Sequence, residues 1–187
     1  MEKFSKMKPE KEVEEKDSTL YDDGKLKLIK YEDWTIIDKH DVVICMIYLV
    51  ELNQIVIRQE YIPAYKYKDG QEYHIALVGG GIEKDETPEE ALLREIQEEA
   101  GIVIRENFVI EFEKPLFISK GNSNKYYPAI IQLNENDYHE ITIKGDGSKK
   151  EAMSKTAKVD LKYIHSINTS DLISEYMVTL FKNYLNL

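Results

Sequence analysis

The spacing of three glutamates, Glu95, Glu98 and Glu99, is the feature of this chain that most clearly suggests a metal-binding site. At positions i, i+3 and i+4 of a helix, their carboxylates fall on one patch, where like charges repel each other. A cation bound in the patch would remove that repulsion, and Mg²⁺ and Mn²⁺ prefer oxygen ligands of this kind. The ordinary alternative is a solvated acidic helix surface, which is common. The choice between the two depends on what the rest of the sequence places beside the glutamates.

The helix that carries these glutamates has clear start and stop signals. Thr87 and Glu90 have the spacing of a capping box, and Pro88 suits the first helical position. Gly101 stands where helices commonly end in the left-handed conformation. The spacing predicts an apolar face toward the core, made by Ala91, Leu92, Ile96 and Ala100.

The loop and helix together resemble the Nudix box, G-x5-E-x7-R-E-U-x-E-E-x-G-U, in which U is an apolar residue. The residues that fill its defined positions, in order, are Gly80, Glu86, Arg94, Glu95, Ile96, Glu98, Glu99, Gly101 and Ile102. The resemblance implies an α/β protein with the Nudix-type α/β/α sandwich around a mixed β-sheet. It also implies hydrolysis of a nucleoside diphosphate linked to another moiety, and it decides against the purely solvated helix.

The resemblance implies roles for the individual residues of the box. Glu95, Glu98, Glu99 and the Gly79 carbonyl would hold Mg²⁺ (or Mn²⁺), and Glu86 and Arg94 would form the pair that orients the loop and helix. The metal would neutralise diphosphate oxygens and lower the pKa of a coordinated water. The glycine run, including Gly80, would let the backbone approach metal and substrate phosphate closely.

The sequence outside the box resembles the ADP-ribose pyrophosphatase branch of the same superfamily. The segment Arg58-Gln59-Glu60-Tyr61-Ile62-Pro63 precedes the glycine loop as in that branch, and Gly121-x-Ser123 follows a predicted strand. This chain differs where the branch usually has a second arginine (here Tyr61) and a glutamate (here Ala76). N-terminal strands of such enzymes often cross onto a partner, which implies a homodimer.

Several residues outside the box are candidates for contact with substrate, each with a structural alternative. Arg58 is expected to hold the diphosphate or to form a salt bridge on the sheet. Tyr61 and Trp34 are expected to stack on a base or to pack in the core. His74 either touches phosphate or is a satisfied strand histidine.

The candidate general base is Glu151, with Asp146 as a second choice, because both lie in the long polar stretch after the box. The favoured reaction cleaves ADP-ribose or a related nucleoside diphosphate sugar to two monophosphates. The alternatives are hydrolysis of dinucleoside polyphosphates, NADH or (d)NTPs, and a nucleotide sensor without catalysis.

Composition narrows the functional class further. The 187 residues carry a formal charge of −10, which argues against a nucleic-acid partner because phosphate backbones attract basic surfaces. The single cysteine, Cys45, excludes an intrachain disulfide and favours the cytoplasm. The longest apolar run, 42–50, is too short to span a membrane. We expect a flexible charged tail over 1–19 and one Nudix domain over 20–187.

The periodicity predicts a strand-rich chain around the box helix. Segment 63–71 is polar and Tyr-rich, with a turn expected at Asp69-Gly70. Ser170 is expected to cap a final helix. The apolar stripe of that helix is predicted to be Leu172, Tyr176, Leu180, Phe181 and Tyr184. The predicted strands cover 26–31, 34–37, 42–50, 55–61, 75–78, 108–112, 115–119, 127–133, 139–143 and 159–164.

Overall fold

The computed structural model describes residues 18–24, 26–105, 108–143 and 152–187. The chain divides into two compact units, one made of residues 1–39 and 119–123 and the other of residues 40–118 and 124–187. Every helix of the described residues is too short or too polar to cross a membrane.

The smaller unit is a three-stranded antiparallel sheet in the order β1-β2-β3. Its strands are β1 (Ser18–Asp22), β2 (Lys27–Tyr31) and β3 (Trp34–Asp38). The segment 119–123 pairs with β3, where the Ile37 N–H donates to the Gly121 carbonyl over 2.8 Å. The Ser123 hydroxyl also donates to the Asp38 carboxylate. Strand β1 therefore begins inside the range that was expected to be a tail.

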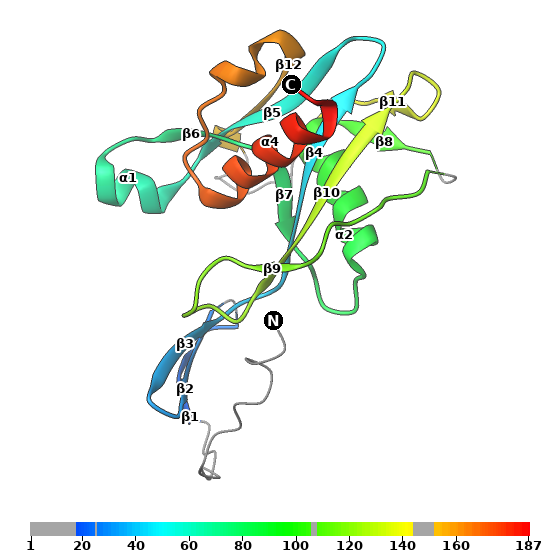
Figure 1. Cartoon of the computed structure of the whole chain (residues 1–187). Helices are drawn as coiled ribbons and strands as arrows, with labels where there is room; N and C mark the ends of the chain where they lie inside the picture. The colour runs from blue at the N-terminus through cyan, green and yellow to red at the C-terminus, as the bar shows by residue number, and fades with distance from the viewer. Residues whose placement is uncertain (1–17, 25, 106–107, 144–151) are drawn as a thin grey trace, which may run out of the picture. The chain divides into compact units, whose positions relative to one another are not determined.

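The larger unit is built on a seven-stranded mixed sheet in the order β12-β5-β4-β10-β9, with β6 paired to β5 and β7 paired to β4 (Figure 1). Strands β4 and β10 run parallel, and the other pairs are antiparallel. The strands are β4 (Val42–Leu49), β5 (Gln54–Tyr61), β6 (Tyr73–Ala76), β7 (Val78–Gly81), β9 (Leu116–Phe117), β10 (Lys125–Leu133) and β12 (Lys155–Asp160). A separate two-stranded antiparallel sheet consists of β8 (Ile102–Ile104) and β11 (Tyr138–Glu140).

The central strand β4 is apolar on both faces because each face packs against a different helix. Val43, Cys45 and Ile47 belong to the core cluster that includes Leu92 and Ile96 of the box helix. Ile44 and Met46 point the other way and pack in the cluster that holds α4 (Leu172–Leu185). Helices therefore cover both faces of the sheet, and the predicted α/β/α sandwich is confirmed.

The box helix forms as its capping signals predict. Helix α2 (Pro88–Glu95) has Thr87 as its N-cap, and Thr87 and Glu90 form the full capping box. It continues as the π-helical turn η1 (Ile96–Ala100), and Gly101 follows with φ 65°. The wider π-helical turn was not predicted, and it falls on the segment that contains Glu98 and Glu99. Single π turns inside helices occur frequently at functional sites.

Segment 63–71, for which only a turn at Asp69-Gly70 was predicted, is mostly the helix α1 (Pro63–Asp69). Pro63 occupies its first turn, and Gly70, with φ 75°, ends it in the left-handed conformation. None of its residues is buried, so no apolar periodicity revealed it. Its termini were the only signal: a proline at the start and a glycine just past the end.

The final helix is present, but its cap and its buried face differ from the prediction. Asp171, not Ser170, accepts the cap hydrogen bond from the Ser174 N–H, at 2.8 Å. Met177 and Val178 are fully buried, whereas Leu172, Tyr176 and Tyr184 of the predicted stripe are exposed. Phe181 is buried as expected. Two apolar stripes run along this helix, and only packing against the sheet decides between them.

Several predicted strands after the box differ in the structure. Segment 108–112 forms a single bridge from Phe112 to Ala129 and no strand, and 115–119 contributes only the two-residue strand β9. The last strand, predicted at 159–164, is β12 at Lys155–Asp160, and η2 (Leu161–Ser166) is a 3-10 helix. These apolar runs are short, and short runs do not distinguish strand from other buried backbone.

Candidate active site

The glycines of β7 let its backbone lie directly against the box helix. A Cβ atom at Gly80 would lie 2.0 Å from Oε1 of Glu95, and one at Gly79 would lie 2.4 Å from the Val43 carbonyl oxygen. Neither position has room for a side chain. The absence of side chains brings the strand backbone to the first predicted metal ligand, as close approach to a ligand site requires.

Arg94 lies at the centre of the first group of carboxylates. Its Nε and Nη2 atoms bind the two oxygens of Glu86 at 2.9 and 3.0 Å, and Nη2 also donates to the Gly81 carbonyl. Its Nη1 atom binds Glu95 at 2.7 Å and Glu98 at 3.4 Å. The guanidinium thus joins the loop before the helix to two of the three carboxylates that are predicted to bind the metal. The fork of the guanidinium suits this two-oxygen contact with Glu86.

The protonation equilibria of this group follow from the same contacts. The hydrogen bond from Arg94 lowers the pKa of the Glu86 carboxyl below its ordinary value. The bonds to Glu86, and then those to Glu95, raise the pKa of Arg94. The guanidinium therefore stays charged and offsets the repulsion among the carboxylates around it.

Glu99 belongs to a second group, which is buried beneath the first. Nη2 of Arg58 binds its Oε1 at 3.1 Å, and the Gly79 N–H donates to its Oε2 at 3.0 Å. Nη1 of Arg58 reaches the Glu99 carbonyl at 3.2 Å and the Thr156 hydroxyl oxygen at 3.3 Å. The Thr156 hydroxyl in turn donates to the same carbonyl. One arginine thus ties β5 and β12 to the end of the box helix.

The position of Arg58 corrects the expectation that it contacts substrate. The residue is only 1% exposed, so its guanidinium is unable to reach a ligand in this conformation. It forms the salt bridge that was the alternative interpretation. The signal that could have identified this role is its location in an apolar strand, where a charge is stable only beside an opposite charge.

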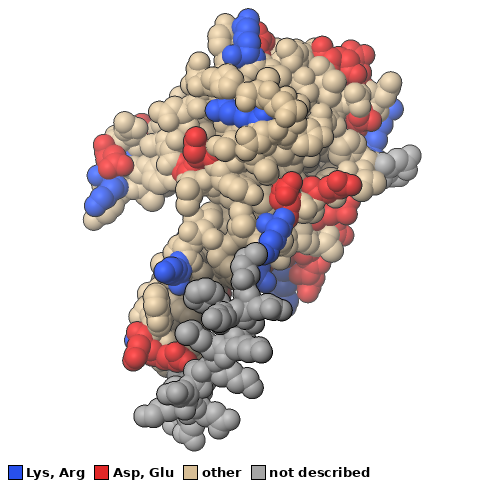
Figure 2. Space-filling view, in the orientation of Figure 1, with Lys and Arg blue, Asp and Glu red and all other residues tan. Residues whose placement is uncertain are grey.

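The carboxylates of both groups have the donor chemistry of a site for a hard divalent cation. They offer oxygen atoms alone, and Figure 2 shows acidic side chains gathered over the part of the surface formed by α2. In the described residues, no three histidine, cysteine or acidic side chains converge closely enough to hold a metal ion. The carboxylates are paired with Arg94 and Arg58 instead. Glu98 has the longest contact and the most exposed side chain, at 34%. The residues therefore fit Mg²⁺ in type, with Glu98 as the ligand most readily available.

The negative charges of the box glutamates also affect the buried thiol of Cys45 inside the sheet. Burial raises its pKa well above the ordinary value, and the negative charges of Glu99 and then Glu95 raise it further. The neutral thiol is an ordinary core residue, as expected.

The other residues predicted to contact substrate lie outside the two groups that Arg94 and Arg58 form. Tyr61 is half-buried at the end of β5, with its ring edge-on to Tyr73 at 6.2 Å. Trp34 is 55% exposed on β3 of the smaller unit, so the core alternative is wrong for it.

His74 is buried beside Tyr65, and its Nε2 atom has no hydrogen-bond partner among the described residues. Glu151 and Asp146, the candidate bases, lie outside the described residues.

Comparisons with known proteins agree with this geometry. A family model described as NUDIX domain matches residues 38–143, which is more than half of the chain. The fold is similar to the crystal structure of an ADP compounds hydrolase, with a TM-score of 0.67 and 15% sequence identity, over 91% of this chain and 92% of that chain. No curated protein matches this sequence closely. With its complete box, and with the sandwich fold that positions it, the chain belongs to the Nudix family of hydrolases.

Proposed function

We propose that this Nudix hydrolase uses Mg²⁺ or Mn²⁺ to cleave the diphosphate of ADP-ribose or a related nucleoside diphosphate sugar into two monophosphates. One observation carries the proposal: the glycine strand β7 lies against Glu95 and Glu99 at the end of the box helix, and Arg94 joins Glu95 to Glu98 beside it. The similar structure of an ADP compounds hydrolase supports the substrate class. The branch-like segment at Arg58–Pro63 agrees with it.

Hydrolysis adds one water molecule across the diphosphate. A water oxygen attacks one phosphorus, the bond from that phosphorus to the bridging oxygen breaks, and the bridging oxygen leaves with the other phosphate. A divalent metal bound by Glu95, Glu98, Glu99 and the Gly79 carbonyl would supply charge neutralisation and an acidic water. Arg94 orients Glu95 and Glu98, and Arg58 orients Glu99. The glycine backbone leaves room for the phosphates.

The decisive variant is Glu98→Gln, assayed with ADP-ribose and Mg²⁺. The change removes one ligand charge while keeping the shape of the side chain, so we expect kcat to fall by about 100-fold or more with an unchanged melting temperature. Glu89→Gln is the matched control, since Glu89 is an exposed residue of the same helix. Phosphorus NMR should show AMP and ribose 5-phosphate only when metal is present. Turnover of the Glu98 variant at the control's rate would refute the metal assignment.

We also infer a homodimer, which the resemblance implies. In the smaller unit, strands β1 and β3 expose Leu20, Tyr21 and Trp34, which are 58%, 49% and 55% accessible. Burial of such exposed apolar side chains against a partner would stabilise a dimer. Sedimentation equilibrium should give twice the chain mass, and Trp34→Ser should shift the equilibrium toward the monomer. A monomeric wild-type protein at micromolar concentration would rule the dimer out.

We expect the enzyme to act in the cytoplasm. Its one cysteine, Cys45, is buried and free, so the chain needs no oxidising compartment to fold. Recovery in the cytosolic fraction of its cells would agree with this location, and recovery elsewhere would contradict it.

A further inference from the structure

A pocket of about 330 Å³ lies between β7 and the start of α4. Its walls come from β4, β5, β6, β7 and β10, from α1 and from the first turn of α4. Gly79 forms part of the wall, and the Gly79 N–H is also bonded to the carboxylate of Glu99. Gly79 is therefore common to the wall of the pocket and to the predicted metal site. Its volume suits one sugar ring or a group of similar size.

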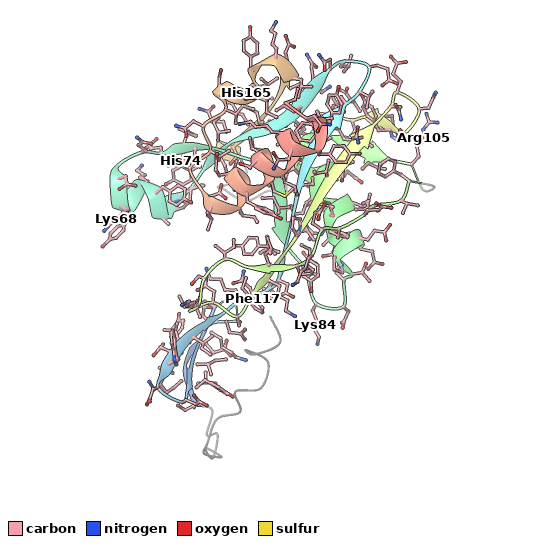
Figure 3. The ribbon with its side chains drawn as sticks, in the orientation of Figure 1. Lys68, His74, Lys84, Arg105, Phe117 and His165 are labelled. Carbon is pink, nitrogen blue, oxygen red and sulfur yellow. The ribbon has the colours of Figure 1, made fainter. Side chains whose placement is uncertain are left out.

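The charged groups of this pocket are all acidic. Glu60 and Asp171 line it, together with the hydroxyl-bearing Tyr65 and Tyr126, and no lysine, arginine or histidine is among its described lining residues. Figure 3 shows the nearby Lys68 at the outer end of α1, pointing away from the body of the larger unit. The pKa of Tyr65 is raised by burial and then by the charges of Asp171 and Glu60. Negative potential thus dominates the pocket.

Asp171 also removes the usual affinity of a helix start for anions. Its Oδ1 atom accepts the Ser174 N–H at 2.8 Å, so a carboxylate already occupies the cap of α4. A phosphate that entered here would meet this negative charge instead of free N–H groups. Carboxylate and phenol oxygens are instead good partners for the hydroxyl donors of a sugar.

We propose that Glu60, Tyr65 and Asp171 form a specificity pocket that accepts a neutral, hydroxyl-rich end of the substrate and excludes an end that carries an additional negative charge. The inference rests on the proposed diphosphate hydrolysis, because it assumes that the scissile diphosphate lies at the β7 end of the pocket. The preferred substrates are then nucleoside diphosphates of neutral sugars. Sugar acids and substrates with a phosphate at this end are disfavoured.

The test compares UDP-glucose with UDP-glucuronate, which share the nucleotide and the diphosphate and differ by one carboxylate on the sugar. We expect the wild-type enzyme to prefer UDP-glucose in kcat/KM by about tenfold, as one poorly screened like-charge contact would give. Asp171→Asn and Glu60→Gln should each reduce that preference by about threefold or more. Asparagine is itself a good N-cap, so Asp171→Asn keeps the start of α4 intact.

The control is Glu111→Gln, which removes one negative charge from an exposed position outside the pocket. It should leave the preference unchanged, which separates a local contact from an effect of net charge. A wild-type preference near one, or an unaltered preference in both pocket variants, would overturn the proposal. Melting temperatures of all variants should match the wild-type value.

A binding measurement separates failure of the pocket from failure of the proposed reaction. Calorimetric titration of both sugar nucleotides in EDTA gives the same preference as a ratio of Kd values without turnover. Absence of hydrolysis with a charge-dependent Kd ratio would reject the reaction and support the pocket. Hydrolysis of both compounds at equal kcat/KM would contradict the specificity role of the pocket and would support the proposed reaction.

Discussion

Two arginines hold the carboxylates of the box, and they do so in different surroundings. Arg94 binds Glu86, Glu95 and Glu98 with a side chain that is 26% exposed. Arg58 binds Glu99 with a side chain that is 2% exposed, and the Glu99 side chain is 8% exposed. The first group can exchange its partners with water, whereas the second is locked in the interior. We infer that Arg94 permits metal binding near the surface and that Arg58 fixes the end of the helix in place.

Replacing each arginine should separate these two roles, and Arg58→Met should have the largest effect on stability. The substitution leaves the Glu99 charge buried without its partner, which costs about 3 to 5 kcal/mol of the free energy of unfolding. Arg94→Met should cost about 1 to 2 kcal/mol, since solvent screens its exposed contacts. Urea denaturation of both variants and the wild type measures the two losses directly.

A double variant tests whether the buried pair causes that loss. Adding Glu99→Gln to Arg58→Met removes the unpaired charge, so the double variant should be more stable than the sum of the two single losses predicts. Equal losses for Arg58→Met and Arg94→Met, or strict additivity in the cycle, would mean that the two groups do not differ as described.

A smaller effect is expected in the pH dependence of stability. The folded protein lowers the pKa of Glu86 below its ordinary value of 4.5, chiefly through the hydrogen bond from Arg94. The stability from this contact is therefore fully present above about pH 4.5 and is lost as the pH falls through the lower, folded-state pKa. Urea midpoints between pH 6 and pH 3 should fall less steeply for Glu86→Gln than for the wild type. Parallel curves for the two proteins would show that Glu86 contributes nothing to the acid response.

Local patterns account for most of what the sequence predicted correctly. The capping box at Thr87, the helix end at Gly101 and the apolar strand at 42–50 each depend on neighbours within a few residues. The pairing of Glu86 with Arg94 is also local, because it spans one loop and two turns of a helix. The α/β/α sandwich followed from the resemblance, and β4 shows its physical basis in two faces that each pack against a helix.

The predictions from sequence fail where contacts between distant segments determine the local structure. Ser170 and Asp171 are both good caps, and α4 has apolar residues on two adjacent stripes, so only packing against the sheet selects Asp171 and Met177. Helix α1 buries none of its residues, so its sequence carries no apolar periodicity that would reveal it.

By itself, the sequence determined the acidic box helix, its caps and the carboxylates that are expected to hold a metal. Those features depend on residue type and on spacing along the chain, which a sequence states directly. The tertiary structure alone decided that Arg58 faces Glu99, 41 positions away, and that Glu60 and Asp171 share one pocket. These pairs lie on strands and helices whose register is set by burial of the whole core, so no short stretch of sequence encodes them.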